Sequence, residues 1–187
     1  QALRQKGAVI KSSKGEFAVN VKVSEGCEGL DPADLVVFVV KSYDTEEAAS
    51  EMLSVINEQT AVLTIQNGID NPERIASMIG AERVLSGFTK LGVNVLEPGV
   101  IRHIASGEVY FNERDGKETE RVRIIRSLFR RAGIPVFTPL DIRKEMWKKF
   151  LWNCTCNIAP AITGLTLNRL YECSSGADML RQLMGEV

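Results

Sequence analysis

Strand-like and helix-like segments alternate along the first 140 residues of the chain, and only helix-like segments follow. The run at 35–40 is short, rich in β-branched residues and apolar on both faces, and the run at 61–65 is interpreted as a second buried strand. Such runs are typical of parallel strands that are buried between helices. Alternation of this kind builds an α/β sheet, whereas consecutive helices build a separate domain. The sequence therefore predicts an α/β domain over residues 1–140 and a helical domain over residues 141–187.

Glycine, proline and helix-capping residues predict where these elements end. Asp44 or Thr45 is a suitable N-cap for the helix after the first of these strands, and Asn71 precedes Pro72 at the start of another helix. We expect helices at 45–56, 71–79, 118–132, 142–162 and 167–186, the last of them broken near 174–176. We expect turns between strands at Lys14-Gly15, Pro98-Gly99 and Ser106-Gly107.

The composition is that of a soluble globular protein. Hydrophobic residues make up 44% and charged residues 25% of the 187 residues, and the formal net charge is -1. No basic stretch predicts nucleic-acid binding, and the longest apolar run, 35–40, is too short to cross a bilayer. The four cysteines form no C-x-x-C pair and there is one histidine, so a zinc site is not expected. We expect unpaired thiols in a cytoplasmic protein without nucleic-acid, membrane or metal partners.

Polar residues follow both of the predicted buried strands. Lys41 comes directly after one strand, and Gln66-Asn67-Gly68 ends the other. Open α/β sheets bind ligands at the carboxyl ends of their strands, where a lysine can meet a phosphate and an asparagine offers donors and an acceptor. The alternatives are a solvated loop lysine and an ordinary Asn-Gly turn. Two polar ends on neighbouring strands point towards a ligand cleft at this edge.

Lys149, Asn153 and Asn157 are spaced four residues apart and form one polar stripe along a predicted helix. Large apolar residues, including Trp147 and Trp152, surround the stripe, so we expect the helix to be buried. Buried asparagines need hydrogen-bond partners and are poor residues for a helix interior. The stripe therefore points to a polar site, and the alternative is a solvent-facing seam.

Four stretches of the chain resemble the ketopantoate reductases (2-dehydropantoate 2-reductases). They are L-V-V-F-V-V-K-S-Y-D-T, L-T-I-Q-N-G-I-D, L-E-P-G-V-I-R-H, and W-K-K-F-L-W-N-C-T-C-N followed by T-G-L-T. The resemblance extends over essentially the whole chain. It implies a Rossmann-type NADPH-binding domain with a parallel sheet, here without its first βαβ unit. A helical domain of the 6-phosphogluconate dehydrogenase C-terminal type would follow, cut short, with the active site in the cleft between the domains.

The resemblance also implies roles for the residues of the stripe. Lys149 matches the catalytic lysine that donates a proton to the substrate carbonyl oxygen, and Asn153 and Asn157 match residues that hold the keto acid. These residue types suit the reaction, because hydride addition to a ketone builds negative charge on the oxygen. A positioned ammonium can stabilise and protonate that oxygen. Neutral amides can orient a carboxylate-bearing substrate without competing for the proton.

On the cofactor side, Asn67 matches an asparagine at the nicotinamide and substrate end, Lys41 a lysine beside the cofactor, and Val93 a position whose backbone meets it. The chain departs from the family because it has no G-x-G-x-x-G. The arginine that would select a 2′-phosphate belongs to the same absent stretch. The chain starts at Gln1 rather than at a methionine and stops at Val187 in a helix-like segment, so we expect both ends to be incomplete.

The resemblance implies an NADPH-dependent 2-dehydropantoate 2-reductase of pantothenate and coenzyme A biosynthesis, with a 2-keto acid as substrate and a homodimer as the family's expected state. Two other kinds of function stay open. One is a reductase of another 2-keto acid, or an opine-type dehydrogenase of the same two-domain build. The other is a catalytically silent paralogue that binds a nucleotide. The spacing of the lysine and the two asparagines favours the first reading, and NADPH turnover with a panel of 2-keto acids discriminates among them.

Overall fold

The computed structural model of the protein describes residues 1–13 and 15–187. The chain divides into two compact units. The sheet unit contains residues 1–66 and 70–142, and the helical unit contains residues 67–69 and 143–187. The short segment 67–69 thus groups with helices that come much later in the sequence.

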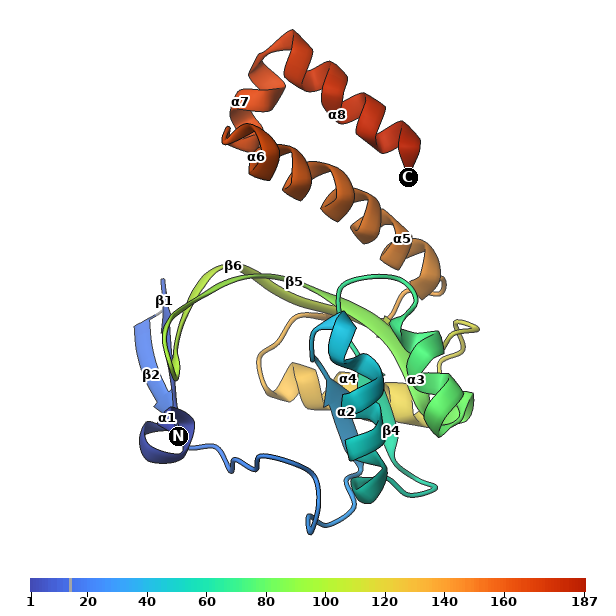
Figure 1. Ribbon diagram of the computed structural model, residues 1–187. Coiled ribbons are helices and arrows are strands. Elements are labelled where there is room, and N and C mark those ends of the chain that lie inside the picture. Colours follow the sequence, from blue (N-terminus) through green and yellow to red (C-terminus); the bar gives the residue numbers. More distant parts are fainter. Residues whose placement is uncertain (14) are drawn as a thin grey trace. The chain divides into compact units, whose positions relative to one another are not determined.

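In the part of the chain that the structure describes, the sheet unit holds a seven-stranded mixed sheet in the order β2-β1-β6-β5-β4-β3, with β7 beside β6 (Figure 1). The strands are Ala8–Ser12 (β1), Gly15–Val19 (β2), Leu35–Phe38 (β3), Ala61–Thr64 (β4), Val84–Glu97 (β5), Val100–Asn112 (β6) and Val136–Phe137 (β7). Strands β3, β4 and β5 run parallel, whereas β5 and β6 form a long antiparallel hairpin. β1 and β2 pair antiparallel, and Lys14 of the turn expected between them lies outside the described residues.

Helices cover both faces of the central strands. They are Thr45–Met52 (α2), Asn71–Ile79 (α3) and Glu120–Arg131 (α4). Ala2–Lys6 (α1) has no buried residue and leads into β1, and 3₁₀ turns lie at Ser42–Asp44, Leu53–Val55 and Ala81–Arg83. Val62 of β4 packs with residues of α2 and α3, whereas its neighbour Leu63 packs with residues of α4. Successive residues of a strand point to opposite faces, so both sides of β4 are covered. Every residue of β4 is buried, which confirms the expectation for this run.

The expectation that 35–40 is buried on both faces is wrong. β3 ends at Phe38, and Val37 and Val39 are 39% and 63% exposed. Among the described residues β3 pairs only with β4 and so forms the edge of the sheet. Its apolar run was typical of a strand with a neighbour on each side, and an edge position leaves part of that surface to the solvent. Lys41 therefore lies in a loop three residues beyond the strand rather than directly after it.

The expected turn at Ser106-Gly107 is also wrong, because both residues lie inside β6. The pairing of β5 with β6 shifts register between Lys90 and Leu91, opposite this point, as a β-bulge does. Ser106 has φ of 59°, and Gly107 has φ of 129°. Ser106 and Gly107, which are residue types common in turns, thus form an irregularity within β6 and do not end the strand. The turn at Pro98-Gly99 does join the two strands, as expected.

The start of α2 agrees with one of the two expected N-caps, Asp44, whereas the start of α3 differs from the expectation by one residue. Asp44 and Asp70 occupy the N-cap positions of α2 and α3, and neither makes a side-chain capping hydrogen bond. Thr45 and Asn71 are instead the first residues of these helices, and both are buried. The Thr45 hydroxyl donates to Oδ1 of Asn71 at 3.1 Å, so the two predicted capping residues bind each other across the helix starts.

The helical unit continues from α5 (Ile142–Trp152) through a π-helical turn (Asn153–Asn157) into α6 (Ile158–Thr163), α7 (Leu167–Glu172) and α8 (Ser174–Glu186). Ala159, Leu170 and Leu180 form its core. Gly164, in the left-handed conformation with φ of 69°, ends α6 at the expected break. The second break falls at Cys173, just before the expected site at 174–176. The predicted fold class, an α/β sheet followed by helices, is confirmed.

Candidate active site

The candidate site is built on the helix that carries the Lys–Asn–Asn stripe. Lys149 lies in α5, and Asn153 and Asn157 lie in the π-helical turn that follows. Nδ2 of Asn157 donates a hydrogen bond to Oδ1 of Asn153 at 3.2 Å. Nδ2 of Asn153 donates in turn to Oδ1 of Asn67 at 3.4 Å. Three of the predicted site residues therefore form one chain of amide hydrogen bonds inside the helical unit.

The π-helical turn interrupts the continuous α-helix that was expected over 142–162. Inside this turn the buried Thr155 donates its hydroxyl to the carbonyl oxygen of Leu151 at 2.8 Å, a side-chain bond to the preceding turn. Single π turns within α-helices occur frequently at functional sites. The signal in the sequence was the pair Asn153 and Asn157, since asparagine is a poor residue for a helix interior.

The helix is less buried than its apolar residues predicted. Trp147 and Trp152 are 40% and 47% exposed, whereas Lys149 and Asn153 are half-buried. In the described part of the helical unit α8 packs against the π turn and Cys156 is buried, but the indole side remains accessible. The sequence pattern indicates that the helix is apolar, but it does not indicate how many other elements pack against the helix. Lys149 also takes part in a polar interaction of its own.

Asn67 lies in the segment that joins β4 to α3. Gly68 next to it has φ of 105°, which residues with a side chain rarely adopt. The Asn-Gly pair therefore does act as a turn, as the alternative reading had it. Asn67 is exposed, and its side chain accepts a hydrogen bond from Asn153.

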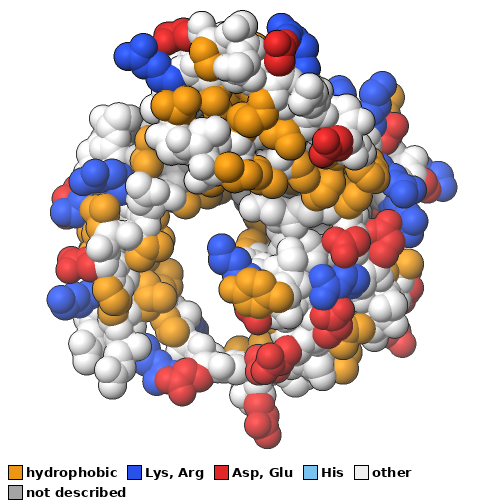
Figure 2. Space-filling model, turned by 45° about the horizontal axis from the view of Figure 1, so that its top comes forward, with side chains coloured by type: hydrophobic (Ala, Val, Ile, Leu, Met, Phe, Trp, Pro, Cys, Tyr) orange, Lys and Arg blue, Asp and Glu red, His pale blue; other side chains and the backbone are white. Residues whose placement is uncertain are grey.

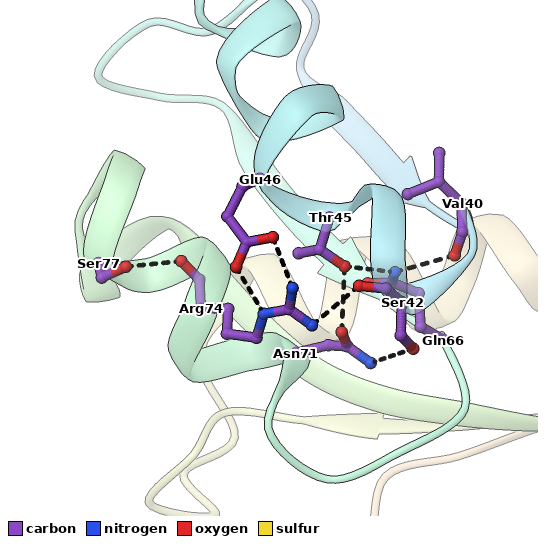
Figure 3. A network of polar contacts seen from close by, with 8 residues as sticks. All are labelled: Val40, Ser42, Thr45, Glu46, Gln66, Asn71, Arg74 and Ser77. Atoms are coloured by element: carbon purple, nitrogen blue, oxygen red, sulfur yellow. Dashed lines mark hydrogen bonds and ion pairs between the residues drawn. The ribbon is translucent and has the colours of Figure 1, made fainter.

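Lys41 is exposed, and polar contacts hold the residues on both sides of it (Figure 3). Nε2 of Gln66 donates to the carbonyl oxygen of Val40 at 2.9 Å. Nδ2 of Asn71 donates to Oγ of Ser42 at 3.1 Å. In the sequence, Gln66 and Asn71 look like ordinary turn and capping residues, so this network was not predicted. The feature of the sequence that could have indicated the network is a second amide, Gln66, which lies between a wholly buried strand and Asn67.

One ion pair completes the network. The Arg74 guanidinium binds Glu46 with its Nε and NH2 atoms at 2.8 and 2.5 Å, and its NH1 atom donates to the carbonyl oxygen of Ser42 at 2.8 Å. The hydrogen bond from Arg74 lowers the pKa of Glu46, and the same bond raises the pKa of Arg74. Each partner thus favours the charged form of the other, and Arg74 also donates to the loop that carries Lys41.

Val93 lies farther along the sheet. β5 pairs with β4 at Val84–Ser86, whereas Val93 lies in the stretch that pairs with β6, opposite His103 and next to a register shift. Its side chain is partly exposed. The proposed contact between its backbone and the cofactor stays a prediction.

The remaining observations concern the surface charge, the cysteines, possible metal ligands and the lengths of the helices. On the face drawn in Figure 2, basic and acidic side chains are interspersed, with hydrophobic side chains between them. The cysteines Cys27, Cys154, Cys156 and Cys173 are free. The described residues contain no cluster of three His, Cys, Asp or Glu side chains that could hold a metal ion. No helix in residues 1–13 and 15–187 has the length and hydrophobicity needed to cross a bilayer.

The arrangement suits a small ligand with a carbonyl and a carboxylate. Each asparagine amide offers both a donor and an acceptor, and the amides of Asn67, Asn153 and Asn157 are already oriented by one another. Lys149 supplies an ammonium one helical turn before Asn153, as a positive charge and a proton donor. Lys41 supplies a second exposed ammonium in the sheet unit, where an anionic group could bind.

Comparison with known families gives two matches along the chain. Residues 1–116 match the family described as ketopantoate reductase PanE/ApbA, and residues 141–187 match the C-terminal part of the same family. The first match ends before the last strand of the sheet, and the second begins next to the start of α5.

Individual proteins agree with the family match. The chain is 35% identical over 154 residues to a 2-dehydropantoate 2-reductase of Halobacterium salinarum, covering 82% of this chain and 50% of that protein. The crystal structure of 2-dehydropantoate 2-reductase from Geobacter metallireducens matches with a TM-score of 0.92 and 29% identity, over 100% of this chain and 62% of that one. A D-mandelate dehydrogenase solved with NADH and anilino(oxo)acetate shares the fold, with a TM-score of 0.87 and 20% identity, over 96% of this chain and 58% of that one. The chain thus spans about half to three fifths of the length of these relatives.

Proposed function

Since this chain belongs to the ketopantoate reductase PanE/ApbA family, we propose that the complete protein reduces 2-dehydropantoate, a 2-keto acid, to pantoate with NADPH. The observation that carries the proposal is the hydrogen bond between Asn153 and Asn67. Both residues belong to the helical unit, and the bond links the segment 67–69, which follows β4 in the chain, to the helix that holds Lys149. In this role the protein works in the cytoplasm, in pantothenate biosynthesis, as a homodimer.

In the proposed reaction Lys149 acts on the keto oxygen of the substrate. When bound, NADPH would supply the hydride for the carbonyl carbon. The Lys149 ammonium stabilises the negative charge that develops on the oxygen and donates the proton that converts it to a hydroxyl. Asn153 and Asn157 hold the substrate carboxylate and keto group in place with their amides. Preorganised neutral donors of this kind orient an anion without taking up the proton.

For the cofactor we propose Lys41, Asn67 and the backbone at Val93 as contacts. The chemistry of these residues fits a nicotinamide dinucleotide. Lys41 is an exposed cation in a loop beyond β3, and it suits an anionic group. Asn67 can bind a carboxamide, and the absence of a side chain at Gly68 permits a close approach. We assign residues 1–140 to the cofactor domain and residues 141–187 to the start of the substrate and dimerisation domain.

The complete protein is expected to oxidise NADPH in the presence of 2-dehydropantoate. The absorbance of NADPH should be followed with this substrate and with a panel of other 2-keto acids, each also tested with NADH. The highest kcat/KM should be found with 2-dehydropantoate and NADPH. A higher kcat/KM with an aryl 2-keto acid would instead assign the protein to a different reductase of this fold. Binding of NADPH without turnover of any 2-keto acid would identify a catalytically silent paralogue.

Asn153→Ala is expected to raise the KM for the 2-keto acid about tenfold to a hundredfold, because the change removes the amide that links Asn157 to Asn67. The KM for NADPH should change less, since Asn153 is not itself a proposed cofactor contact and meets only one of them, Asn67. Steady-state kinetics with each substrate varied in turn measures both constants. The matched control is Asn168→Ala, the same substitution at an exposed position of α7, where neither KM should change. Equal KM values for wild type and Asn153→Ala would remove Asn153 from the substrate site.

A further inference from the structure

Gln66 is a buried amide that ties together the carboxyl ends of two strands (Figure 3). It is 6% exposed. Its Nε2 atom donates to the carbonyl oxygen of Val40 beyond β3 at 2.9 Å and to Oγ1 of Thr45 at 3.1 Å. Its Oε1 atom accepts from Oγ1 of Thr64, the last residue of β4, at 2.9 Å. All of its polar atoms are therefore bound, and the amide has one fixed orientation.

The contacts around Gln66 converge on the loop that carries Lys41. The Val40 carbonyl is held by Gln66 on one side of this lysine. On the other side the Ser42 hydroxyl accepts from Asn71 at 3.1 Å, and the Ser42 carbonyl accepts from Arg74 at 2.8 Å. The backbone of Lys41 is thus bracketed by three hydrogen bonds from the next strand and helix, while Lys41 itself is exposed.

Packing alone does not explain an amide at this position. An apolar side chain of similar volume could fill this position, so what the amide adds is its three hydrogen bonds, which offset the cost of burying it. A polar link also joins the opposite ends of β3 and β4, where no predicted site residue lies nearby. There Oγ1 of Thr60, which is 2% exposed, donates to the carbonyl oxygen of Ala33 at 2.7 Å. What distinguishes the Gln66 end is the lysine that its contacts bracket.

We propose that Gln66 is a positioning residue that holds the Val40–Ser42 backbone so that the Lys41 ammonium meets an anionic group of the bound dinucleotide. The inference rests on the proposed function, in which Lys41 binds the cofactor. A loop that is already ordered loses little conformational entropy on binding, whereas a loose loop pays that cost at each binding event. Gln66 therefore acts on cofactor affinity through Lys41 and has no contact with the reacting atoms.

The test compares Gln66→Met with Thr60→Val in the complete protein. Met fills a similar volume without donors, and Val removes the hydroxyl at the other end of the strand pair. Both variants are expected to lower the melting temperature by similar amounts. Gln66→Met should raise the Kd for NADPH, measured by fluorescence titration, about tenfold, the loss expected for one weakened charge-assisted contact. Thr60→Val should leave that Kd within about twofold of wild type, a change too small to reflect a lost contact. The KM for the 2-keto acid should stay the same in both.

A double mutant identifies the route of the effect. In a Lys41→Ala background, Gln66→Met should change the NADPH Kd by less than about twofold, since residues that act through one contact are not additive. A full additional loss in that background would contradict positioning through Lys41. So would a Gln66→Met variant with the wild-type Kd, or a Thr60→Val variant with the same rise.

Ser42→Ala offers a second route to the same question if Gln66→Met is poorly folded. Ser42 is only half-buried, and this change removes the hydroxyl that Asn71 binds on the other side of Lys41. A rise in the NADPH Kd that disappears in the Lys41→Ala background supports the inference, and an unchanged Kd overturns it. The outcome is separable from the proposed function, because a wild-type protein that binds NADPH but reduces no 2-keto acid refutes the function and still reports on Gln66.

Discussion

Lys149→Ala is expected to lower kcat by about a hundredfold to ten-thousandfold, because the variant loses the proton donor and the charge that stabilises the developing alkoxide. The protein should stay folded, since Lys149 is only half-buried and the core of the helical unit is formed by Ala159, Leu170 and Leu180. The rate of NADPH oxidation, followed by absorbance at saturating 2-keto acid, measures kcat, and circular dichroism checks the fold. NADPH binding should be close to that of wild type.

The adjacent lysine is the matched control for this prediction. Lys148 is exposed and pairs with Glu145 at 2.6 Å on the surface of α5, so Lys148→Ala should leave kcat unchanged. Lys149→Arg is the second control, because it keeps the positive charge while a guanidinium does not give up its proton near neutral pH. It should bind the keto acid better than Lys149→Ala and still turn over slowly. Near-normal turnover in Lys149→Ala would mean that another group protonates the substrate.

Phe111→Ala is expected to lower the free energy of unfolding by about 3–5 kcal/mol, the range for an aromatic side chain deleted from a well-packed core. Phe111 lies in β6, is fully buried, and packs with Val122 and Ile125 of α4. Its ring lies 6.1 Å from that of Phe129, centroid to centroid. The deletion would therefore leave a cavity between the sheet and α4. Urea denaturation followed by circular dichroism measures the change.

Phe17→Ala makes the same substitution at a strand position that is 54% exposed. It should cost no more than about 0.5 kcal/mol, as surface substitutions usually do. If the two variants were equally destabilised, the cluster beneath α4 would not be the main core of the sheet unit. If neither were destabilised, the contacts of Phe111 would contribute little to the folded state.

The sequence by itself determined the features that depend on local periodicity and on residue type. The largely apolar run before Gln66 predicted a buried strand, and every residue of β4 is buried. Amphipathic spacing predicted α4, and Gly164 predicted the end of α6. The spacing of Lys149, Asn153 and Asn157 placed three polar side chains along one helix. Each of these inferences needs only the geometry of a single element, which the chain carries in its own pattern.

The tertiary structure decided the features that depend on neighbours. An apolar run does not show which other segments pair with a strand, so Val39 was expected to be buried and is exposed among the described residues. Ser106 was expected in a turn, and pairing with β5 places it at a β-bulge inside β6. The contact between Asn67 and Asn153 joins residues far apart in sequence, and so does the link from Gln66 to Val40. Such contacts arise only when separate elements pack together, because each partner comes from a different element of the chain.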